Sequence, residues 1–257
     1  MIEIKNLTKI YKLNKKQQKE QKTKSTQKKA VDDLSLTVQP GEIFGLLGTN
    51  GAGKTTTLRC LATLLKPTRG TITVDGLDVC HDAEKVRAKI SFLTNEIKMD
   101  PYFTPDYLFS FFGRLRGMKE EEINARKKEL FEYFGIMDFK DKKVEELSTG
   151  MKQKVSIAVS LVHDPEIIIF DEPTNGLDII TARAVLDYLR MLKERGKTII
   201  VSTHVMSEAQ KLCDRIAIII DGKLAAMGTL EELEAQTGSG DLEDAFFEFY
   251  RQYEKEA

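Results

Sequence analysis

The sequence contains no tryptophan and only three cysteines in 257 residues. Cys60, Cys80 and Cys213 are far apart and show no Cys-x-x-Cys or Cys/His ligand spacing. Neither a disulfide framework nor a zinc site is therefore expected, and three reduced thiols are typical of a cytosolic protein. The sequence has no apolar run near the length of about 20 residues that a membrane span needs, and no apolar signal segment follows Met1. Any membrane role is expected to come through a partner.

An excess of charge of one sign is also lacking. The formal net charge is −1, which excludes a generally basic nucleic-acid binder but leaves room for a local basic patch. No nucleic-acid partner is expected. Hydrophobic residues make up 41% and charged residues 31% of the chain, as in ordinary globular proteins. The length suits one large α/β domain, or a core with a smaller inserted subdomain, and we predict a single domain over residues 1–257.

Residues 14–29 consist mainly of Lys, Gln, Ser and Thr, with seven lysines and one acidic residue. Such a stretch cannot bury apolar surface, so a mobile loop is expected. A solvated insertion is the favoured interpretation. The alternative is a contact with anionic lipid headgroups or RNA, and the sequence does not decide between the two.

Apolar periodicity predicts two layers of strands. Residues 1–12 alternate as an edge strand, and residues 34–38 form a second strand that completes an antiparallel hairpin. From residue 43 the order becomes strand 43–47, glycine-rich turn and helix 55–65, which is typical of a parallel α/β core. Strands return at 167–170, 198–202 and 216–220, separated by helical stretches such as 182–195. These segments predict a wound parallel sheet.

Two further segments complete the predicted organisation. Thr104-Pro105-Asp106 is a helix start, and residues 97–161 are expected to form an inserted helical subdomain. Residues 222–257 are expected to form a hairpin and a terminal helix. One face of that helix is apolar, and it is expected to dock on the protein's own core rather than on a partner. Its residues are Leu242, Ala245, Phe246, Phe249, Tyr250 and Tyr253.

The glycine-rich turn matches the pattern G-x-x-x-x-G-K-[ST] between an apolar strand and a helix. Its residues are Gly48, Thr49, Asn50, Gly51, Ala52, Gly53, Lys54 and Thr55. The glycines let backbone amides close around phosphate oxygens, and the helix N-terminus adds positive potential. Lys54 is expected to reach the β and γ phosphates of a nucleotide, and the Thr55 hydroxyl can ligate Mg²⁺.

Two carboxylates follow the apolar strand that ends at Phe170. Asp171 and Glu172 are therefore expected at the carboxyl edge of the sheet, beside the phosphate loop. Asp171 would hold the Mg²⁺ shell, usually through water, and Glu172 would act as general base on the attacking water. Acidic residues after a strand are common, so the pair alone is weak evidence for a nucleotide site. Combined with the phosphate loop it is strong evidence.

These residues resemble the ATP-binding cassette (ABC) ATPases over essentially the whole chain. The resemblance implies an α/β fold with a P-loop NTPase (RecA-like) parallel-sheet core, an antiparallel β subdomain and an inserted helical subdomain. Ser148 and Gly150 are similar to the signature sequence that contacts the γ phosphate held by the opposite subunit, although Thr149 and Met151 depart from the family's glycine and glutamine. The alternative for this segment is an ordinary helix cap.

Further family positions follow from the resemblance. Asp178 matches the loop that communicates across the dimer, His204 matches the switch histidine, and Tyr11 matches the aromatic residue that stacks on adenine. Asn95 stands where the family has a glutamine that serves the metal, and Glu96 is its rival. The implied sets are Lys54, Glu172 and His204 for catalysis; Thr55, Asn95 and Asp171 for Mg²⁺; and Tyr11, Gly48, Asn50, Gly51, Ala52, Gly53, Lys54, Thr55, Thr56, Ser148, Gly150 and Asp178 for ATP.

The resemblance implies an ATPase that clamps two Mg-ATP in a dimer with itself or a paralogous ATPase, and that drives a membrane-spanning permease from the cytoplasmic face of the membrane. Its aromatic segment, Tyr102, Phe103, Tyr107, Phe109, Phe111 and Phe112, is expected to lie mostly in the core, with an exposed minority forming the groove for the permease. Within the family the chain looks most like ABC-2 type exporters, notably the NatA-type sodium-export subunits. The alternatives are a soluble ABC ATPase not coupled to transport and a module that binds nucleotide without hydrolysis, against which Glu172 and His204 argue.

Overall fold

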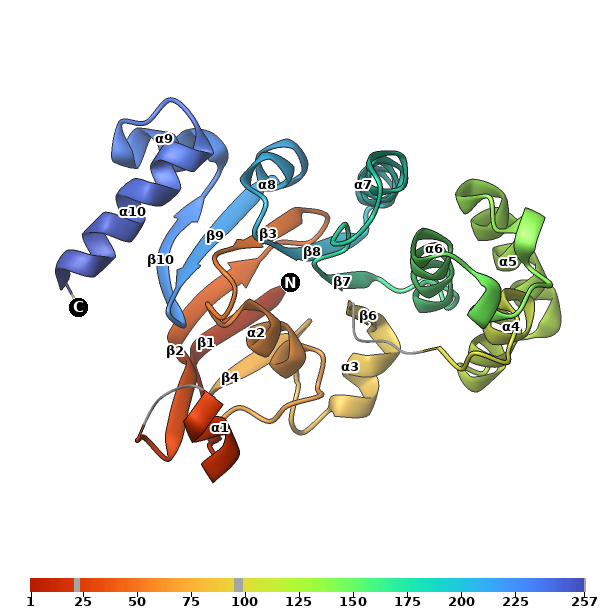
Figure 1. The fold of residues 1–257 in the computed structure, drawn as a ribbon, viewed down its shortest axis with the longest axis horizontal. Helices are drawn as coiled ribbons and strands as arrows, with labels where there is room; N and C mark the ends of the chain where they lie inside the picture. The colour runs from red at the N-terminus through yellow and green to blue at the C-terminus, as the bar shows by residue number, and fades with distance from the viewer. Residues whose placement is uncertain (21–23, 95–98, 257) are drawn as a thin grey trace.

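The computed structural model describes residues 1–20, 24–94 and 99–256, and its described strands form two sheets (Figure 1). The smaller sheet contains β1 (Ile2–Lys12), β2 (Gln27–Val38), β4 (Arg69–Val74) and β5 (Leu77–Asp78) in the order β2-β1-β4-β5. All of its pairs are antiparallel. The predicted hairpin of β1 and β2 is present, with Ile2 opposite Val38.

The prediction that residues 1–12 form an edge strand is wrong. β1 pairs with β2 on one side and with β4 on the other, where Ile4 lies opposite Ile72. β4 was not predicted because it has only two apolar residues, Ile72 and Val74, on its buried face. Two apolar residues give too short an alternation to identify a strand.

The larger sheet is the predicted wound parallel sheet. It contains β3 (Ile43–Leu47), β6 (Ile90–Thr94), β7 (Ile167–Asp171), β8 (Thr198–Thr203), β9 (Arg215–Ile220) and β10 (Lys223–Gly228) in the order β10-β9-β3-β8-β7-β6. The strands from β9 to β6 are parallel, and β10 closes one edge as an antiparallel partner of β9. Every residue of β3, β7 and β8 is buried, as expected for parallel strands covered on both faces.

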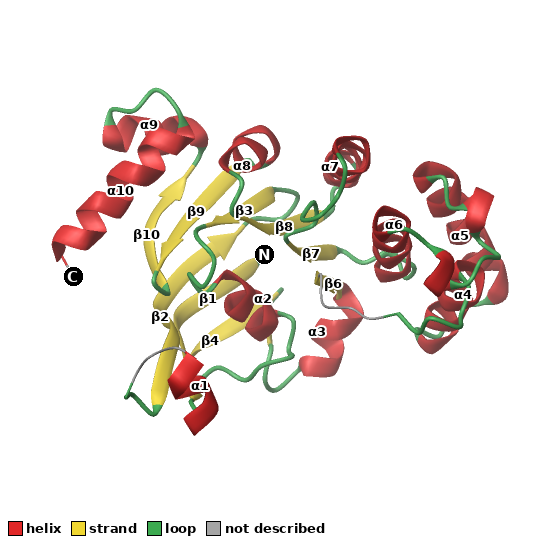
Figure 2. Cartoon of the chain, viewed as in Figure 1, coloured by secondary structure: helices red, strands yellow, loops and turns green. Residues whose placement is uncertain are grey.

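Helix α2 (Lys54–Leu61) packs between the two sheets (Figure 2). Leu58 shares a buried apolar cluster with Leu36 of the small sheet and Ile169 of the large one. The helix was expected to run to residue 65 but ends four residues earlier, because Thr63 takes a left-handed backbone conformation with φ 63° that a helix cannot continue through. α2, which follows the phosphate loop in the chain, therefore packs against both sheets.

The remaining helices lie around this core. α3 (Ala83–Lys89), α7 (Ile179–Glu194) and α8 (Met206–Leu212) connect its strands. The helical subdomain contains α4 (Pro105–Leu115), α5 (Glu120–Phe134), α6 (Thr149–Ser160) and two short 3₁₀ turns, Met137–Phe139 and Val144–Glu146. It occupies one end of the molecule, far from the C-terminal helices (Figure 1). Thr104 caps α4 by accepting a hydrogen bond from the amide of Tyr107 at 3.2 Å, with Pro105 in the first turn, as predicted.

The lysine-rich stretch has more structure than the loop expected over 14–29. A short helix, α1 (Lys15–Glu20), follows β1, and β2 begins at Gln27. The amide of Leu13 donates to the Thr26 carbonyl at 2.8 Å and closes the base of this excursion. Main-chain pairing with β1 extends β2 into a polar sequence because it needs no apolar side chains. Residues 21–23 lie outside the described part.

At the C-terminus, β10 is followed by α9 (Leu230–Thr237) and α10 (Leu242–Glu256). α9 was not predicted, although Thr229 and Glu232 form a capping box at its start. The apolar face of α10 docks on the protein's own core: Leu242, Ala245, Phe246 and Phe249 are buried, and Tyr250 and Tyr253 pack against the same cluster.

Candidate functional site

Residues 48–53 link β3 to α2 and, together with Lys54 and Thr55 at the start of that helix, form the phosphate loop. Gly53 has φ +102°, and a Cβ there would lie 2.4 Å from the Ala30 carbonyl oxygen, so only glycine fits. The amide of Ala52 donates to the Thr49 carbonyl, and its own carbonyl accepts from the amide of Gly222 at 3.0 Å. The loop is thereby fixed between β2 and the turn after β9.

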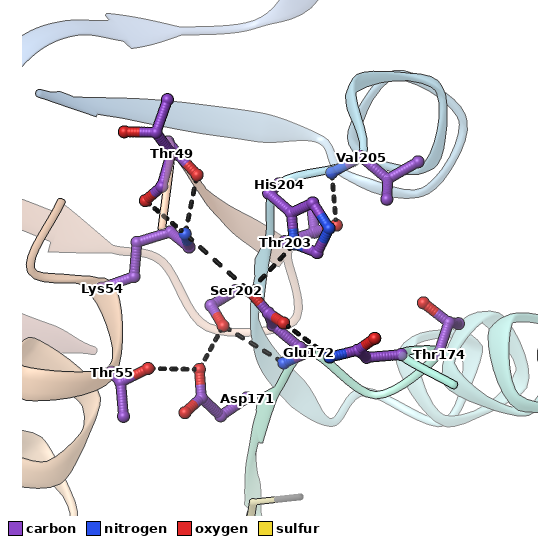
Figure 3. A network of polar contacts seen from close by, with 12 residues as sticks. Thr49, Lys54, Thr55, Asp171, Glu172, Thr174, Ser202, Thr203, His204 and Val205 are labelled. Carbon is purple, nitrogen blue, oxygen red and sulfur yellow. Dashed lines mark hydrogen bonds and ion pairs between the residues drawn. The ribbon is translucent and has the colours of Figure 1, made fainter. Parts of the chain in front are cut away.

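Lys54 lies at the centre of the loop and is 4% exposed. Its ammonium group donates to the carbonyl oxygens of Gly48 at 2.7 Å and Thr49 at 3.1 Å, and it lies 4.0 Å from Oε1 of Glu172 (Figure 3). Burial lowers the pKa of Lys54, and the carboxylates of Glu172 and Asp171 oppose that effect. An anionic ligand that approaches this ammonium would likewise raise its pKa and stabilise its protonated form.

Asp171 ends β7 opposite Ser202 of β8, at the carboxyl edge of the parallel sheet. The hydroxyl of Thr55 donates to Oδ1 of Asp171 at 3.1 Å, and the hydroxyl of Ser202 donates to the same oxygen. Three oxygen-bearing side chains therefore meet where the phosphate loop faces the sheet. Hydroxyl and carboxylate oxygens are the ligands that Mg²⁺ prefers.

Glu172 lies one residue beyond the strand, in a left-handed backbone conformation with φ 52°. Its amide donates to the carbonyl of Ser202 at 3.1 Å and to its hydroxyl at 3.2 Å, which holds this strained residue in place. Oε1 of Glu172 lies 3.0 Å from Nδ1 of His204, and Oε2 accepts from the side-chain amide of Asn175 at 3.1 Å. The carboxylate is aimed towards Lys54 and His204 (Figure 3).

These groups border a pocket of about 320 Å³. Tyr11, Lys28, Lys54, Thr55 and Glu172 line it. The remaining residues around it are Lys12, Leu13, Ala30, Asn50, Gly51, Gly53 and Thr56. The structure thus brings most of the predicted nucleotide-binding residues together around one cavity. Of the others, Gly48 and Ala52 shape the loop through their backbones, as described above.

Ser148, Gly150 and Asp178 form a different cluster. Ser148 caps α6 by accepting from the amide of Met151 at 3.2 Å. Asp178 caps α7: its Oδ1 accepts from the amides of Ile180 and Thr181, each at 3.0 Å. These hydrogen bonds, above all those from Thr181, hold the pKa of Asp178 below its usual value. None of the three residues lines the 320 Å³ pocket.

The cap of α6 and the cap of α7 lie close together at Gly150. A Cβ built on it would lie 3.5 Å from Oδ2 of Asp178, so the N-termini of α6 and α7 are neighbours on one surface. Ile179 and Ile180, at the start of α7, are 89% and 83% exposed. An adjacent pair of almost fully exposed isoleucines beside two helix N-termini is typical of a surface that another protein covers.

The sequence analysis missed several residues of the site. Ser202 binds Asp171 and the Glu172 amide, and Glu208 accepts hydrogen bonds from Thr174 at 2.8 Å and Thr203 at 3.3 Å, which fixes the loop that carries His204. Ser202 could have been found from its place at the carboxyl end of a parallel strand. Glu208 gives no such signal. Asn95 and Glu96 lie outside the described residues.

A second cavity, of about 420 Å³, opens on the helical subdomain. Four aromatic residues on its wall are between 37% and 44% exposed: Phe103, Tyr107, Phe111 and Phe112. The expectation that most aromatic residues of this segment lie in the core is wrong, since Phe109 alone among the six is buried and Tyr102 is 69% exposed. α4 buries Leu108 and Phe109 against the subdomain, which leaves Tyr107 and Phe111 on its outer side. Phe103, just before the helix, packs against Tyr107.

Two buried polar groups also border this groove. His163 Nε2 donates to the Ile90 carbonyl at 3.2 Å, so its Nδ1 is an acceptor, and Nδ1 has no partner within the described part of the chain. Burial lowers the pKa of His163 to about 4. The hydroxyl of Ser91, which is 1% exposed, is likewise unpaired among the described residues. An occupant with a hydrogen-bond donor would satisfy one of these groups.

Comparison with known proteins identifies the family. The family model described as "ABC transporter" matches residues 31–175. The ATP-binding protein NatA of Bacillus subtilis is 44% identical over 219 residues, which cover 85% of this chain and 89% of NatA. The Nod factor export ATP-binding protein I of Burkholderia lata is 42% identical, over 84% of this chain and 71% of the relative. The daunorubicin resistance ATP-binding protein DrrA3 of Streptomyces coeruleorubidus is 41% identical, over 82% of this chain and 67% of the relative.

Solved structures agree. The ATP-binding subunit of an ABC transporter superposes with a TM-score of 0.84 at 27% identity, over 97% of this chain and 99% of the other. A dimeric post-hydrolysis state of the ATP-binding cassette MJ0796, bound to ADP and Pi, superposes with a TM-score of 0.79 at 30% identity, over 90% of this chain and 99% of the other. With the phosphate loop, the paired carboxylates and the histidine in one site, the chain belongs to the ABC transporter family, as an ATP-binding subunit that hydrolyses ATP.

Proposed function

We propose that this subunit energises export through a separate membrane-spanning partner. The observation that carries the proposal is the aromatic groove of 420 Å³ on the helical subdomain, which shares no lining residue with the nucleotide pocket. In the described residues no helix combines the length and apolar composition needed to cross a bilayer. A partner helix docked in the groove would hold the subunit at the cytoplasmic face of the membrane.

In the proposed reaction a water molecule attacks the γ phosphorus of ATP and ADP leaves. Glu172 takes the proton from that water, and His204, 3.0 Å from Glu172, orients the carboxylate and contacts the γ phosphate. Lys54 stabilises the charge on the transferring phosphoryl group. Positioning and charge stabilisation supply most of the rate in phosphoryl transfer, so a buried ammonium beside two carboxylates suits the task.

The site also fits Mg²⁺. Thr55 and Asp171 share a hydrogen bond of 3.1 Å at the edge of the sheet, and both are hard oxygen ligands. We assign the metal to these two side chains, with Asn95 as the third expected ligand. When bound, Mg²⁺ neutralises charge on the β and γ phosphate oxygens.

We further propose that two copies, or this chain and a paralogous ATPase, enclose two ATP molecules between them. The neighbouring N-termini of α6 and α7 support this. The helix dipole and first-turn amides of α6 favour a phosphate presented by a second subunit, whereas at α7 the Asp178 carboxylate already accepts from the amides of Ile180 and Thr181. The exposed pair Ile179 and Ile180 supplies apolar surface next to them. The MJ0796 cassette is dimeric with ADP and Pi bound.

Sodium is the first cargo to test. The support is 44% identity to NatA, together with the sequence resemblance to NatA-type sodium-export subunits. The other relatives are named for Nod factor export and daunorubicin resistance, so a Nod factor or a drug is the next choice. The alternative function is a soluble ABC ATPase without transport, which the exposed groove disfavours because an isolated enzyme gains nothing from it.

ATP hydrolysis by the purified chain tests the proposal when it is measured with and without membranes that contain the candidate permease. Wild type, Glu172→Gln and the surface control Glu121→Gln would be compared. We expect stimulation by the permease in wild type and in the control, and loss of hydrolysis in Glu172→Gln, which should instead accumulate as an ATP-bound dimer. Activity indifferent to every membrane protein would favour the soluble ATPase, and a Glu172→Gln chain that stays monomeric with ATP would exclude the clamp.

A further inference from the structure

Two lysines outside the phosphate loop, Lys12 and Lys28, line the nucleotide pocket. β2 runs along it, and its residues Lys28 and Ala30 line the pocket. The backbone of β2 lies directly on the phosphate loop, since a Cβ on Gly53 would meet the Ala30 carbonyl at 2.4 Å. The strand that carries Lys28 is therefore fixed relative to the residues expected to bind phosphate.

Strand pairing places Lys28 beside Tyr11. The two residues lie opposite each other in the antiparallel register of β1 and β2. Side chains of opposite residues lie on the same face of a sheet, with Cβ atoms about 5 Å apart. Both border the 320 Å³ pocket. In the described part of the chain no carboxylate forms an ion pair with Lys28, whereas Lys29 pairs with Asp32 at 3.0 Å.

We propose that Lys28 is a nucleotide-binding residue whose ammonium group contacts the phosphate nearest the ribose, while the base stacks on Tyr11. The proposal rests on the placement of the base at Tyr11. Lys54 holds the far end of the triphosphate, so Lys28 and Lys54 contact the phosphate chain from opposite ends. An exposed lysine of this kind gives a modest Coulombic attraction that salt weakens.

Alternation along β2 supplies a matched control. Lys29 is the next residue, is also exposed, and belongs to the other face of the strand. Lys28→Gln and Lys29→Gln remove the same charge from adjacent positions of one strand. Any general effect of net charge or of the lysine-rich segment must appear in both variants, while a direct contact with the nucleotide appears only in the first.

The experiment measures the dissociation constants of ATP and ADP by isothermal titration of the full chain at low and high salt. Lys28→Gln should weaken both nucleotides about three- to fivefold, Lys28→Glu about tenfold or more, and Lys29→Gln by less than twofold. The difference between wild type and Lys28→Gln should shrink at 0.5 M salt, where the Debye length falls to about 4 Å.

Each other outcome has a distinct meaning. Equal binding by wild type, Lys28→Gln and Lys28→Glu would overturn the role of Lys28 and leave the proposed function intact. Equal losses of nucleotide affinity in Lys28→Gln and Lys29→Gln would overturn the direct contact in favour of a general electrostatic effect. Weaker binding of ATP alone, with ADP binding unchanged, would overturn the contact with the phosphate nearest the ribose. A wild-type chain that binds neither nucleotide would overturn this proposal and the proposed function together.

Discussion

The nucleotide pocket and the aromatic groove are built on opposite principles. In the pocket, polar groups are held by one another: Lys54 by loop carbonyls, Asp171 by two hydroxyls, and Glu172 by His204 and Asn175. In the groove, four aromatic side chains are exposed and two buried polar atoms have no partner among the described residues. Preorganised polar groups suit a small charged substrate that must be positioned for reaction, and exposed aromatic surface suits a protein partner.

The largest expected effect comes from a substitution in the nucleotide pocket that leaves the groove unchanged. Lys54→Ala removes the ammonium that faces Glu172 at 4.0 Å, and we expect the rate of ATP hydrolysis to fall about 100- to 1000-fold, as when one charge-stabilising donor is deleted from an active site. Phosphate release by the purified protein measures the rate. Lys142→Ala, an exposed lysine in the helical subdomain, serves as control. A Lys54→Ala protein with near-normal turnover would remove this residue from the catalytic set.

The second prediction concerns the groove and leaves the pocket intact. Burial holds the pKa of His163 at about 4, below the ordinary 6.5, so between these pH values the unfolded chain binds a proton that the native chain does not. The free energy of unfolding must then decrease as pH falls from 6.5 to 4 and should lose about 2 kcal/mol through this histidine, after allowance for its partial exposure. Arg116 and Arg126 add to the cost of protonation, and Asp164 reduces it.

Urea unfolding of wild type and His163→Gln at pH 7 and pH 4.5 measures this contribution. The variant should lose less stability on acidification than wild type by about 2 kcal/mol, since glutamine does not titrate in this range. Carboxylates with lowered pKa, such as Asp75, affect both proteins equally. Identical pH dependence in the two proteins would mean that protonated His163 is tolerated in the groove.

The third prediction tests the aromatic residue of the pocket. Tyr11→Ala should weaken ATP binding about tenfold, because stacking of a base on an aromatic ring contributes about 1 to 3 kcal/mol. Tyr11→Phe keeps the ring and loses only the hydroxyl, which lies 3.5 Å from that of Thr56, and should bind ATP within about twofold of wild type. Equilibrium titration compares the three proteins. Equal losses in both variants would assign the effect to the hydroxyl rather than to stacking.

The sequence predicted the pocket far better than the groove, and the physical reason differs between them. The phosphate loop is a local motif, since residues 48–55 are contiguous and the strand and helix that flank them follow from apolar periodicity. Asp171 was placed correctly because a buried parallel strand must end at the sheet edge. Ser202 and Glu208 act through contacts between segments that are distant in sequence, which periodicity does not report.

The groove was misjudged because composition does not say which side of a helix is covered. α4 is apolar on most of its surface, and the sequence assigned most of its aromatic residues to the core. In the structure Leu108 and Phe109 fill that core, and the residues one turn apart on the outer side remain exposed. The position of β1 was misjudged for a related reason, since its second neighbour, β4, is too polar to be seen from the sequence.

The smallest effect on the purified chain should come from the groove's exposed wall. Tyr107→Ser and Phe111→Ser change side chains that are each 44% exposed, so we expect stability to change by less than about 0.5 kcal/mol and the ATPase rate of the isolated subunit to stay constant. Phe247→Ser, at a 47% exposed phenylalanine on α10, is the matched control. With permease-containing membranes, stimulation should be lost in the groove variants and kept in the control, because only the groove would receive the partner helix. Stimulation retained by Tyr107→Ser and Phe111→Ser together would move the docking surface elsewhere, and stimulation lost in Phe247→Ser would point to the C-terminal helix as that surface.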